Sequence, residues 1–171
     1  SMNAKTKFKI ASITKTFTAV LILQLYQQGK IDLNATFGKY CPNYKGEAKN
    51  KVTIQHLLTY SSGIPNAVND LGMKPYQVPL TIDEFIDKYC SGNLEFTPGE
   101  KSNYSNTEYT ILHKIIENVS TKSFSSLLQE NILNPLKMEN TGLLNSKDII
   151  VGLTSSYTIQ DSTKQLISDE P

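Results

Sequence analysis

The segment from Phe8 to Gly29, FKIASITKTFTAVLILQLYQQG, constrains the fold more than any other part of the chain. Ser12 stands near its start and Lys15 follows three residues later, so a helix that begins here places both side chains on one face. Apolar residues then cover most sides of the helix, and Gly29 is placed to end it. The pattern predicts a central, buried helix over Ser12–Gln28.

The start of such a helix suits acyl-transfer chemistry. Its first backbone N–H groups lack intrahelical acceptors and its dipole is positive there, which stabilises negative charge that develops near Ser12. A serine nucleophile needs an adjacent base, and the amine of Lys15 can serve if its surroundings favour the uncharged form. The spacing alone equally permits a helix-capping Ser12 and a solvated Lys15.

The composition gives no indication of a nucleic-acid or membrane partner. The 171 residues suffice for one domain, and a formal net charge of +1 gives no electrostatic reason to expect nucleic acid or an anionic membrane as partner. The longest apolar run, Ala19–Leu23, is far too short to span a bilayer. The first residues have no signal-peptide pattern, and Ser1-Met2 resembles a remnant of tag cleavage.

The cysteine and histidine patterns indicate no cofactor. Cys41 and Cys90 are too few for a disulfide framework, so we expect two semi-buried thiols rather than a bridge. His56 and His113 stand without metal-ligand spacing. We therefore expect structural histidines and no bound metal.

The rest of the chain is expected to be mostly helical. Thr81 with Glu84, and Ser105 with Glu108, have the spacing of a capping box, in which the two residues bond each other's backbone N–H groups. Further helices are expected over 53–60, 81–89, 105–119 and 123–132, and short strands over 149–151 and 157–159.

Three segments read together resemble one family. They are FKIASITKTFTA at 8–19, HLLTYSSGIP at 56–65 and PGEKSNYSNTEY at 98–109, and NPLKMENTG at 134–142 adds to the match. Their order and wording resemble the serine β-lactamase and penicillin-binding-protein superfamily. The tyrosine that opens the middle motif is typical of the branch with class C β-lactamases, D-Ala-D-Ala carboxypeptidases and esterases.

The resemblance implies a role for each matching residue. Ser12 would be the nucleophile, Lys15 its base partner and Tyr104 a second proton-transfer group, while Asn106 would hydrogen-bond the substrate or Lys15. The substrate would be a β-lactam, a D-Ala-D-Ala-type peptide or an ester, with no cofactor. The parent protein would lie at the bacterial cell surface, in the periplasm or outside the cell.

The chain also departs from the family pattern. The family's third motif, Lys-Thr-Gly or His-x-Gly on an edge strand, is absent after Gly142, and about ten residues precede Ser12. The expected fold is therefore mainly α, the helical subdomain of an α+β β-lactamase/transpeptidase-like fold with most of the sheet missing. Residues 1–7 would be tag remnant and truncated lead-in, 8–142 the helical region, and 143–171 a truncated return toward the sheet.

Two expectations follow from a missing sheet. The sheet-facing surface would be exposed, so the chain could self-associate through it. A non-catalytic helical sensor or interaction module derived from this fold is the alternative to an enzyme fragment.

We expect the isolated chain to be inactive or nearly so, because loss of one oxyanion donor typically lowers the rate about a hundredfold to a thousandfold. A fluorescent penicillin should then fail to label it stoichiometrically. Stoichiometric labelling that Ser12→Ala abolishes would show instead that the chain holds a complete acylation site.

Overall fold

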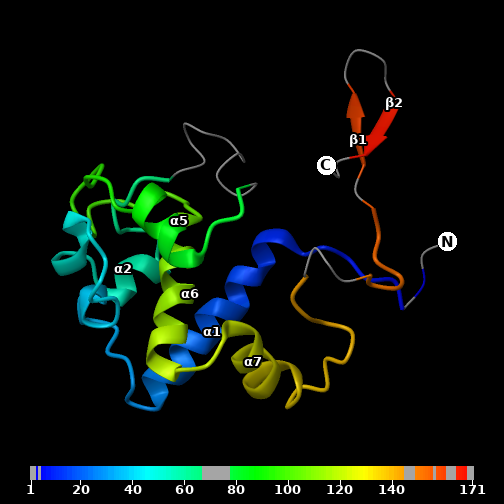
Figure 1. Ribbon diagram of the computed structural model, residues 1–171, viewed down its shortest axis with the longest axis horizontal. Helices are drawn as coiled ribbons and strands as arrows, with labels where there is room; N and C mark the ends of the chain where they lie inside the picture. Colours follow the sequence, from blue (N-terminus) through cyan, green and yellow to red (C-terminus); the bar gives the residue numbers. More distant parts are fainter. Residues whose placement is uncertain are drawn as a thin grey trace.

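The computed structural model describes residues 3, 5–66, 78–144, 149–155, 157–160 and 165–168, and their fold is mainly helical (Figure 1). The α-helices are α1 (Thr14–Gln27), α2 (Ile54–Leu58), α5 (Ile82–Tyr89), α6 (Thr107–Ser120) and α7 (Phe124–Leu128). Short 3-10 helices cover Ala11–Ile13, Phe37–Lys39 and Glu47–Asn50, and a π-helical turn, Gln129–Leu133, follows α7. The strands β1 (Tyr157–Gln160) and β2 (Gln165–Ser168) form an antiparallel pair.

Helix α6 is the centre of the core. It packs against α1, α2, α5 and α7, and in Figure 1 it lies between α1 and α5. Its apolar side chains recur every three to four residues, which places them on one buried stripe. The residues of this stripe that solvent does not reach are Ile111, Leu112, Ile115 and Ile116.

Most helix starts follow the sequence signals. Thr53 caps α2 and Thr81 caps α5, the latter in the expected capping box with Glu84. His56 completes the cap of α2, because its Nδ1 accepts from the N–H of Thr53 at 3.3 Å. Ser123 caps α7 by accepting from the N–H of Ser126. These caps confirm the predicted helices.

The predicted capping box of Ser105 and Glu108 is wrong. Helix α6 begins at Thr107, its N-cap residue Asn106 makes no side-chain capping bond, and Ser105 Oγ accepts instead from the N–H of Thr107 at 3.0 Å. The carboxyl of Glu108 accepts from Ser62. A tertiary contact therefore replaces the local one.

Helix α1 also differs from its prediction. It begins at Thr14, after a 3-10 turn, and it ends with Gly29 in the expected left-handed conformation at φ +69°. Its buried face is formed by Leu21, Ile22 and Leu25. The prediction that α1 is buried on nearly all sides is wrong, because the described residues leave its opposite face exposed.

The segment that precedes α1 meets residues 152–154 beside the helices. Lys7 pairs in parallel with Leu153, and the N–H of Lys7 donates to Gly152 O at 2.8 Å. The strand predicted over 149–151 is wrong, since this segment is irregular, whereas β1 confirms the one predicted over 157–159. Ser1-Met2 lies outside the described residues, as do parts of 143–171.

Two smaller expectations concern chemistry and environment. Cys41 and Cys90 are buried free thiols, as the sequence predicts. No helix in the described ranges has the length and apolarity needed to cross a membrane.

Candidate active site

Ser12 lies at the tip of a constrained turn. The preceding residue, Ala11, has φ +43°, a left-handed backbone conformation that residues other than glycine rarely adopt. Ser12 follows within the 3-10 turn that leads into α1. The turn is closed by a hydrogen bond from the N–H of Ile13 to Ile10 O at 3.0 Å. The side chain of Ser12 is exposed as a result.

The amine of Lys15 donates hydrogen bonds to the other three predicted site residues. Its Nζ donates to Ser12 Oγ at 3.1 Å, to Tyr104 Oη at 2.6 Å and to Asn106 Oδ1 at 2.5 Å. The amine also lies 4.6 Å from the centre of the Tyr104 ring. The structure therefore brings together all four predicted site residues, from two segments that are distant in sequence.

Tyr104 closes the triangle with Ser12 and Lys15. Its hydroxyl donates to Ser12 Oγ at 2.8 Å, so Ser12 Oγ is within hydrogen-bonding distance of both a phenol and an amine. The hydrogen bond from Lys15, aided by the one with Ser12, lowers the pKa of the Tyr104 phenol below its ordinary value. A phenolate at this position is consequently easier to form than in water.

The Asn106 side chain bonds Lys15 and does not cap α6. Asparagine at an N-cap position normally bonds the N–H groups of the first helical turn. Here its side-chain oxygen accepts from Lys15, and no side-chain capping bond is made at α6. The helix start thus positions Asn106 for the site instead of for its own stability.

The segment 59–63 supports the Tyr104 loop, a role that sequence reasoning missed. Tyr60 O accepts from the N–H of Asn103 at 2.8 Å, and the Tyr60 ring lies 4.9 Å from that of Tyr104. Gly63 has φ +76°, and a Cβ there would lie 2.2 Å from Phe96 O. This explains why glycine stands at position 63 of the HLLTYSSGIP segment.

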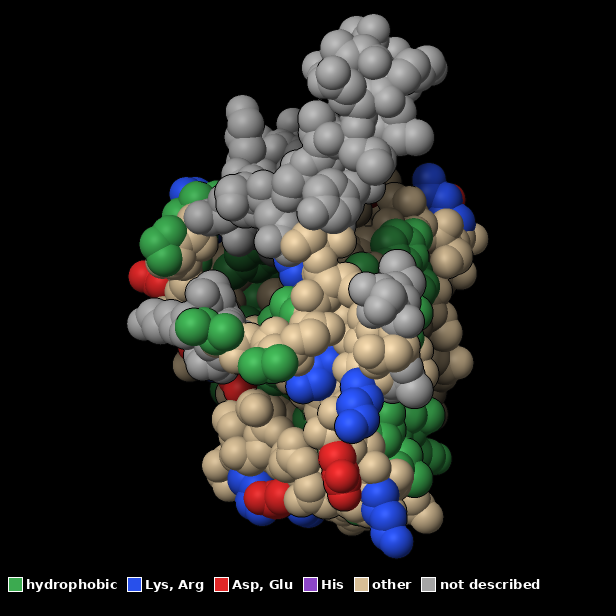
Figure 2. All heavy atoms as spheres, turned by 90° about the vertical axis from the view of Figure 1, so that its right-hand side faces the viewer, with side chains coloured by type: hydrophobic (Ala, Val, Ile, Leu, Met, Phe, Trp, Pro, Cys, Tyr) green, Lys and Arg blue, Asp and Glu red, His purple; other side chains and the backbone are tan. Residues whose placement is uncertain are grey.

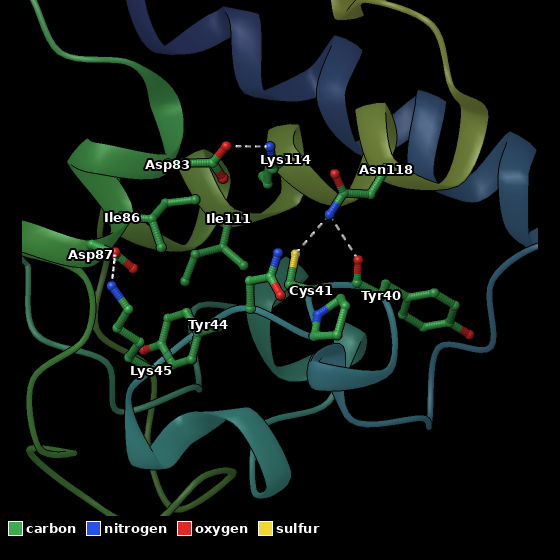
Figure 3. Close-up of a pocket in the computed structure, with 12 residues that line it drawn as sticks. Tyr40, Cys41, Tyr44, Lys45, Asp83, Ile86, Asp87, Ile111, Lys114 and Asn118 are labelled. Carbon is green, nitrogen blue, oxygen red and sulfur yellow. Dashed lines mark hydrogen bonds and ion pairs between the residues drawn. The ribbon is translucent and has the colours of Figure 1, made fainter.

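A hollow of about 620 Å³ between α5, α6 and residues 40–45 holds none of these residues (Figure 3). Several of its polar groups are paired: Lys114 Nζ with Asp83 at 2.7 Å, and Asn118 with Tyr40 O at 3.0 Å. Burial raises the pKa of the Cys41 thiol to about 11, so this thiol stays neutral and is a poor nucleophile. We assign the hollow no chemistry.

A second hollow, of about 850 Å³, is mostly apolar and adjoins the nucleophile turn. It lies between residues 5–11, the start of α1 and residues 138–144. Figure 2 views the molecule from the side of the two chain ends and shows hydrophobic side chains exposed there around a hollowed region. Ile10 and Ile13, on either side of Ser12, are exposed and therefore open to a ligand or to another protein surface.

Comparisons with known proteins show what this chain is similar to. The family model described as Beta-lactamase matches residues 1–168. The chain is 33% identical over 166 residues to "Protein flp" of Staphylococcus aureus (strain MW2), covering 92% of this chain and 32% of the relative. It is 29% identical to the D-alanyl-D-alanine-carboxypeptidase/endopeptidase AmpH of Escherichia coli, covering 82% and 37%.

The similarity extends to a solved structure. The penicillin binding protein from Bacillus halodurans superposes with a TM-score of 0.84 at 25% identity, covering 98% of this chain and 51% of that protein. The chain therefore spans about a third of the length of these curated relatives and about half of the solved one.

Lys15→Met should raise the pKa of Tyr104 back toward its ordinary value of about 10, because the bond that favours the phenolate is lost. Titration of the ¹³Cζ resonance, assigned with Tyr104→Phe, measures this shift. Lys88→Met is a matched control, since it removes a lysine that stacks on Tyr89. An unchanged Tyr104 titration in Lys15→Met would contradict the electrostatic assignment.

Proposed function

The chain belongs to the beta-lactamase family, and from that premise we propose that Ser12 is the nucleophile of a serine acyl-enzyme hydrolase. The single observation that supports this best is the triangle of hydrogen bonds among Ser12, Lys15 and Tyr104. An activated serine needs a base within hydrogen-bonding distance, and two candidates meet that condition here.

We assign the two candidates different tasks. Lys15 donates to three oxygens, which uses all three N–H groups of an ammonium and makes it the charge-stabilising member. In its phenolate form, which the hydrogen bond from Lys15 favours by lowering the pKa of Tyr104, the Tyr104 oxygen accepts the Ser12 proton as the Ser12 oxygen attacks the carbonyl carbon. The same phenol returns the proton to the leaving group as its bond to the acyl carbon breaks. Water later hydrolyses the acyl-serine ester.

The remaining residues fit supporting roles. Ser12 lies in the first turn of a helical segment, where backbone N–H groups lack intrahelical acceptors and can stabilise the oxyanion. Asn106 orients Lys15, and its amide nitrogen would bond the substrate.

The substrate classes we propose are β-lactams, D-Ala-D-Ala-type peptides and related esters or amides. The Escherichia coli relative is named a D-alanyl-D-alanine-carboxypeptidase/endopeptidase. A protein acting on such peptides would work at the bacterial cell surface, in the periplasm or outside the cell. A non-catalytic interaction module is the alternative, and the hydrogen-bonded triangle favours the enzyme.

We further propose that the exposed apolar surface mediates self-association. The solvent-facing side of α1 exposes Leu23 to 47% and Tyr26 to 50%, and apolar residues line the hollow beside the nucleophile turn. Burial of this surface against a second copy would stabilise a dimer by the hydrophobic effect.

Leu23→Glu should weaken such a dimer, because a charge would be buried in the contact. Light scattering across a concentration series measures the mass. Lys30→Glu, an exposed change just beyond α1, controls for the added carboxylate. A wild-type chain that stays monomeric at high concentration would contradict the proposal.

An alkyl fluorophosphonate tests the nucleophile without assuming a substrate. Although we expect little or no turnover of substrate by the isolated chain, Ser12 should slowly displace fluoride from this more reactive probe and gain the phosphonyl mass, and Ser12→Ala should abolish the adduct. Tyr104→Phe should slow the reaction about a hundredfold or more, since it removes the proton acceptor. Intact-mass and peptide spectrometry measure the rate and the site.

Ser125→Ala, on the exposed side of α7, is the matched serine control and should react like the wild type. An adduct that persists in Ser12→Ala, or a rate that Tyr104→Phe leaves unchanged, would overturn the assignment.

A further inference from the structure

Glu108 is a buried carboxyl next to the candidate active site. It is the second residue of α6 and is 1% exposed. Ser62 Oγ donates to its Oε1 at 2.7 Å, and Ser62 is itself inaccessible to solvent. Its Oε2 has no hydrogen-bond partner within the described part of the chain. Glutamate is rarely buried this completely without a charged partner.

Within the residues that the structure describes, no charged group is paired with Glu108. Tyr60, from the loop after α2, and Tyr109, from α6 itself, are the titratable side chains that interact with it electrostatically. Just after α5, the thiol of Cys90 lies next to Thr107. From α1, Lys15 bonds Tyr104 and Asn106 instead.

The protonated form suits this environment. An uncompensated carboxylate is costly to bury, whereas a neutral acid is not. Burial raises the pKa of Glu108 to about 7, against the opposing effect of the Ser62 and Ser105 hydroxyls. The carboxyl is thus neutral in mildly acidic solution and gains charge near neutrality.

The carboxyl connects the 59–63 segment, which supports the Tyr104 loop, to the start of α6. Ser62 belongs to the segment that also supplies Tyr60, which packs on Tyr104 and bonds its loop. On the other side, Glu108 follows Asn106 by two residues on α6. A change at Glu108 therefore reaches both Tyr104 and Asn106, although the carboxyl touches neither.

We propose that Glu108 is a positioning residue, and that its protonated carboxyl holds the 59–63 segment against α6 so that Tyr104 and Asn106 meet Lys15. The inference rests on the proposed function of Ser12. When Glu108 loses its proton, the buried charge weakens this junction, and the site becomes less reactive.

Whether the folded state gains or loses stability with pH follows from the direction in which the pKa of Glu108 is shifted. The pKa of Glu108 is higher in the folded chain than in the unfolded chain, so the folded state binds the proton more tightly. The resulting stabilisation is complete below the unfolded value of about 4.5 and is lost as pH rises through about 7. In the Glu108→Gln variant, the side chain keeps the shape of the protonated carboxyl and stays neutral at every pH.

The test compares wild type with Glu108→Gln between pH 5.5 and 8.5. The ratio of their fluorophosphonate rates at Ser12, wild type over variant, should fall about tenfold across this range as misplacement grows. The wild-type melting temperature should fall relative to that of the variant over the same interval. Glu130→Gln, which removes an exposed carboxylate paired with Lys122, should show neither effect.

The ¹³Cζ resonance of Tyr104 separates the two proposals. In the wild type it should report a titration near pH 7 that Glu108→Gln lacks, whether or not Ser12 reacts. If Ser12 fails to react at any pH while this titration is present, the proposed function falls and the positioning role stands. If wild type and Glu108→Gln give the same Tyr104 titration or the same rate profile, the positioning role is overturned.

Discussion

The contact on which the site depends is that of the Lys15 amine with three oxygens. Two of these oxygens come from Tyr104 and Asn106, which lie 89 and 91 residues further along the chain. Charge-assisted bonds of this kind are stronger than neutral ones and fix donor and acceptor in place. The rest of the fold delivers these partners, because α1 carries Lys15 and the start of α6 carries Asn106, and the two helices pack together.

Backbone strain lies on both sides of this contact. Ala11 precedes the nucleophile with φ +43°, and Tyr60, whose ring packs on Tyr104, has φ +58°. A left-handed residue other than glycine costs on the order of 1–3 kcal/mol and persists only where its surroundings determine it. The hydrogen bonds of the nucleophile turn and of Asn103 with Tyr60 supply that constraint. These hydrogen bonds hold the backbone on both sides of the contact in its left-handed conformation.

Short sequence motifs correctly predicted the helix starts that are fixed by hydrogen bonds between residues close in sequence. The helices that Thr53, Thr81 and Ser123 cap were predictable, because each cap is formed within a few residues. The grouping of Tyr104 with Ser12 came from family resemblance, since no periodicity shows which loop reaches a given helix. The role of the HLLTYSSGIP segment was not predictable, because its bonds go to residues about forty positions away.

A comparison of Thr81-x-x-Glu84 with Ser105-x-x-Glu108 shows what decides whether a capping box forms. Thr81 and Glu84 stand on an exposed helix start, form the capping box, and the bonds from Thr81 lower the pKa of Glu84. Ser105 and Glu108 have the same spacing, yet burial raises the pKa of Glu108 and its carboxyl turns to Ser62. A lost cap costs about 1 kcal/mol, and local rules tend to be broken where function requires it. At the start of α6, neither Asn106 nor Glu108 makes the capping bond that its position predicts, since Asn106 bonds Lys15 and Glu108 bonds Ser62. This is why we propose that the start of α6 positions the site residues.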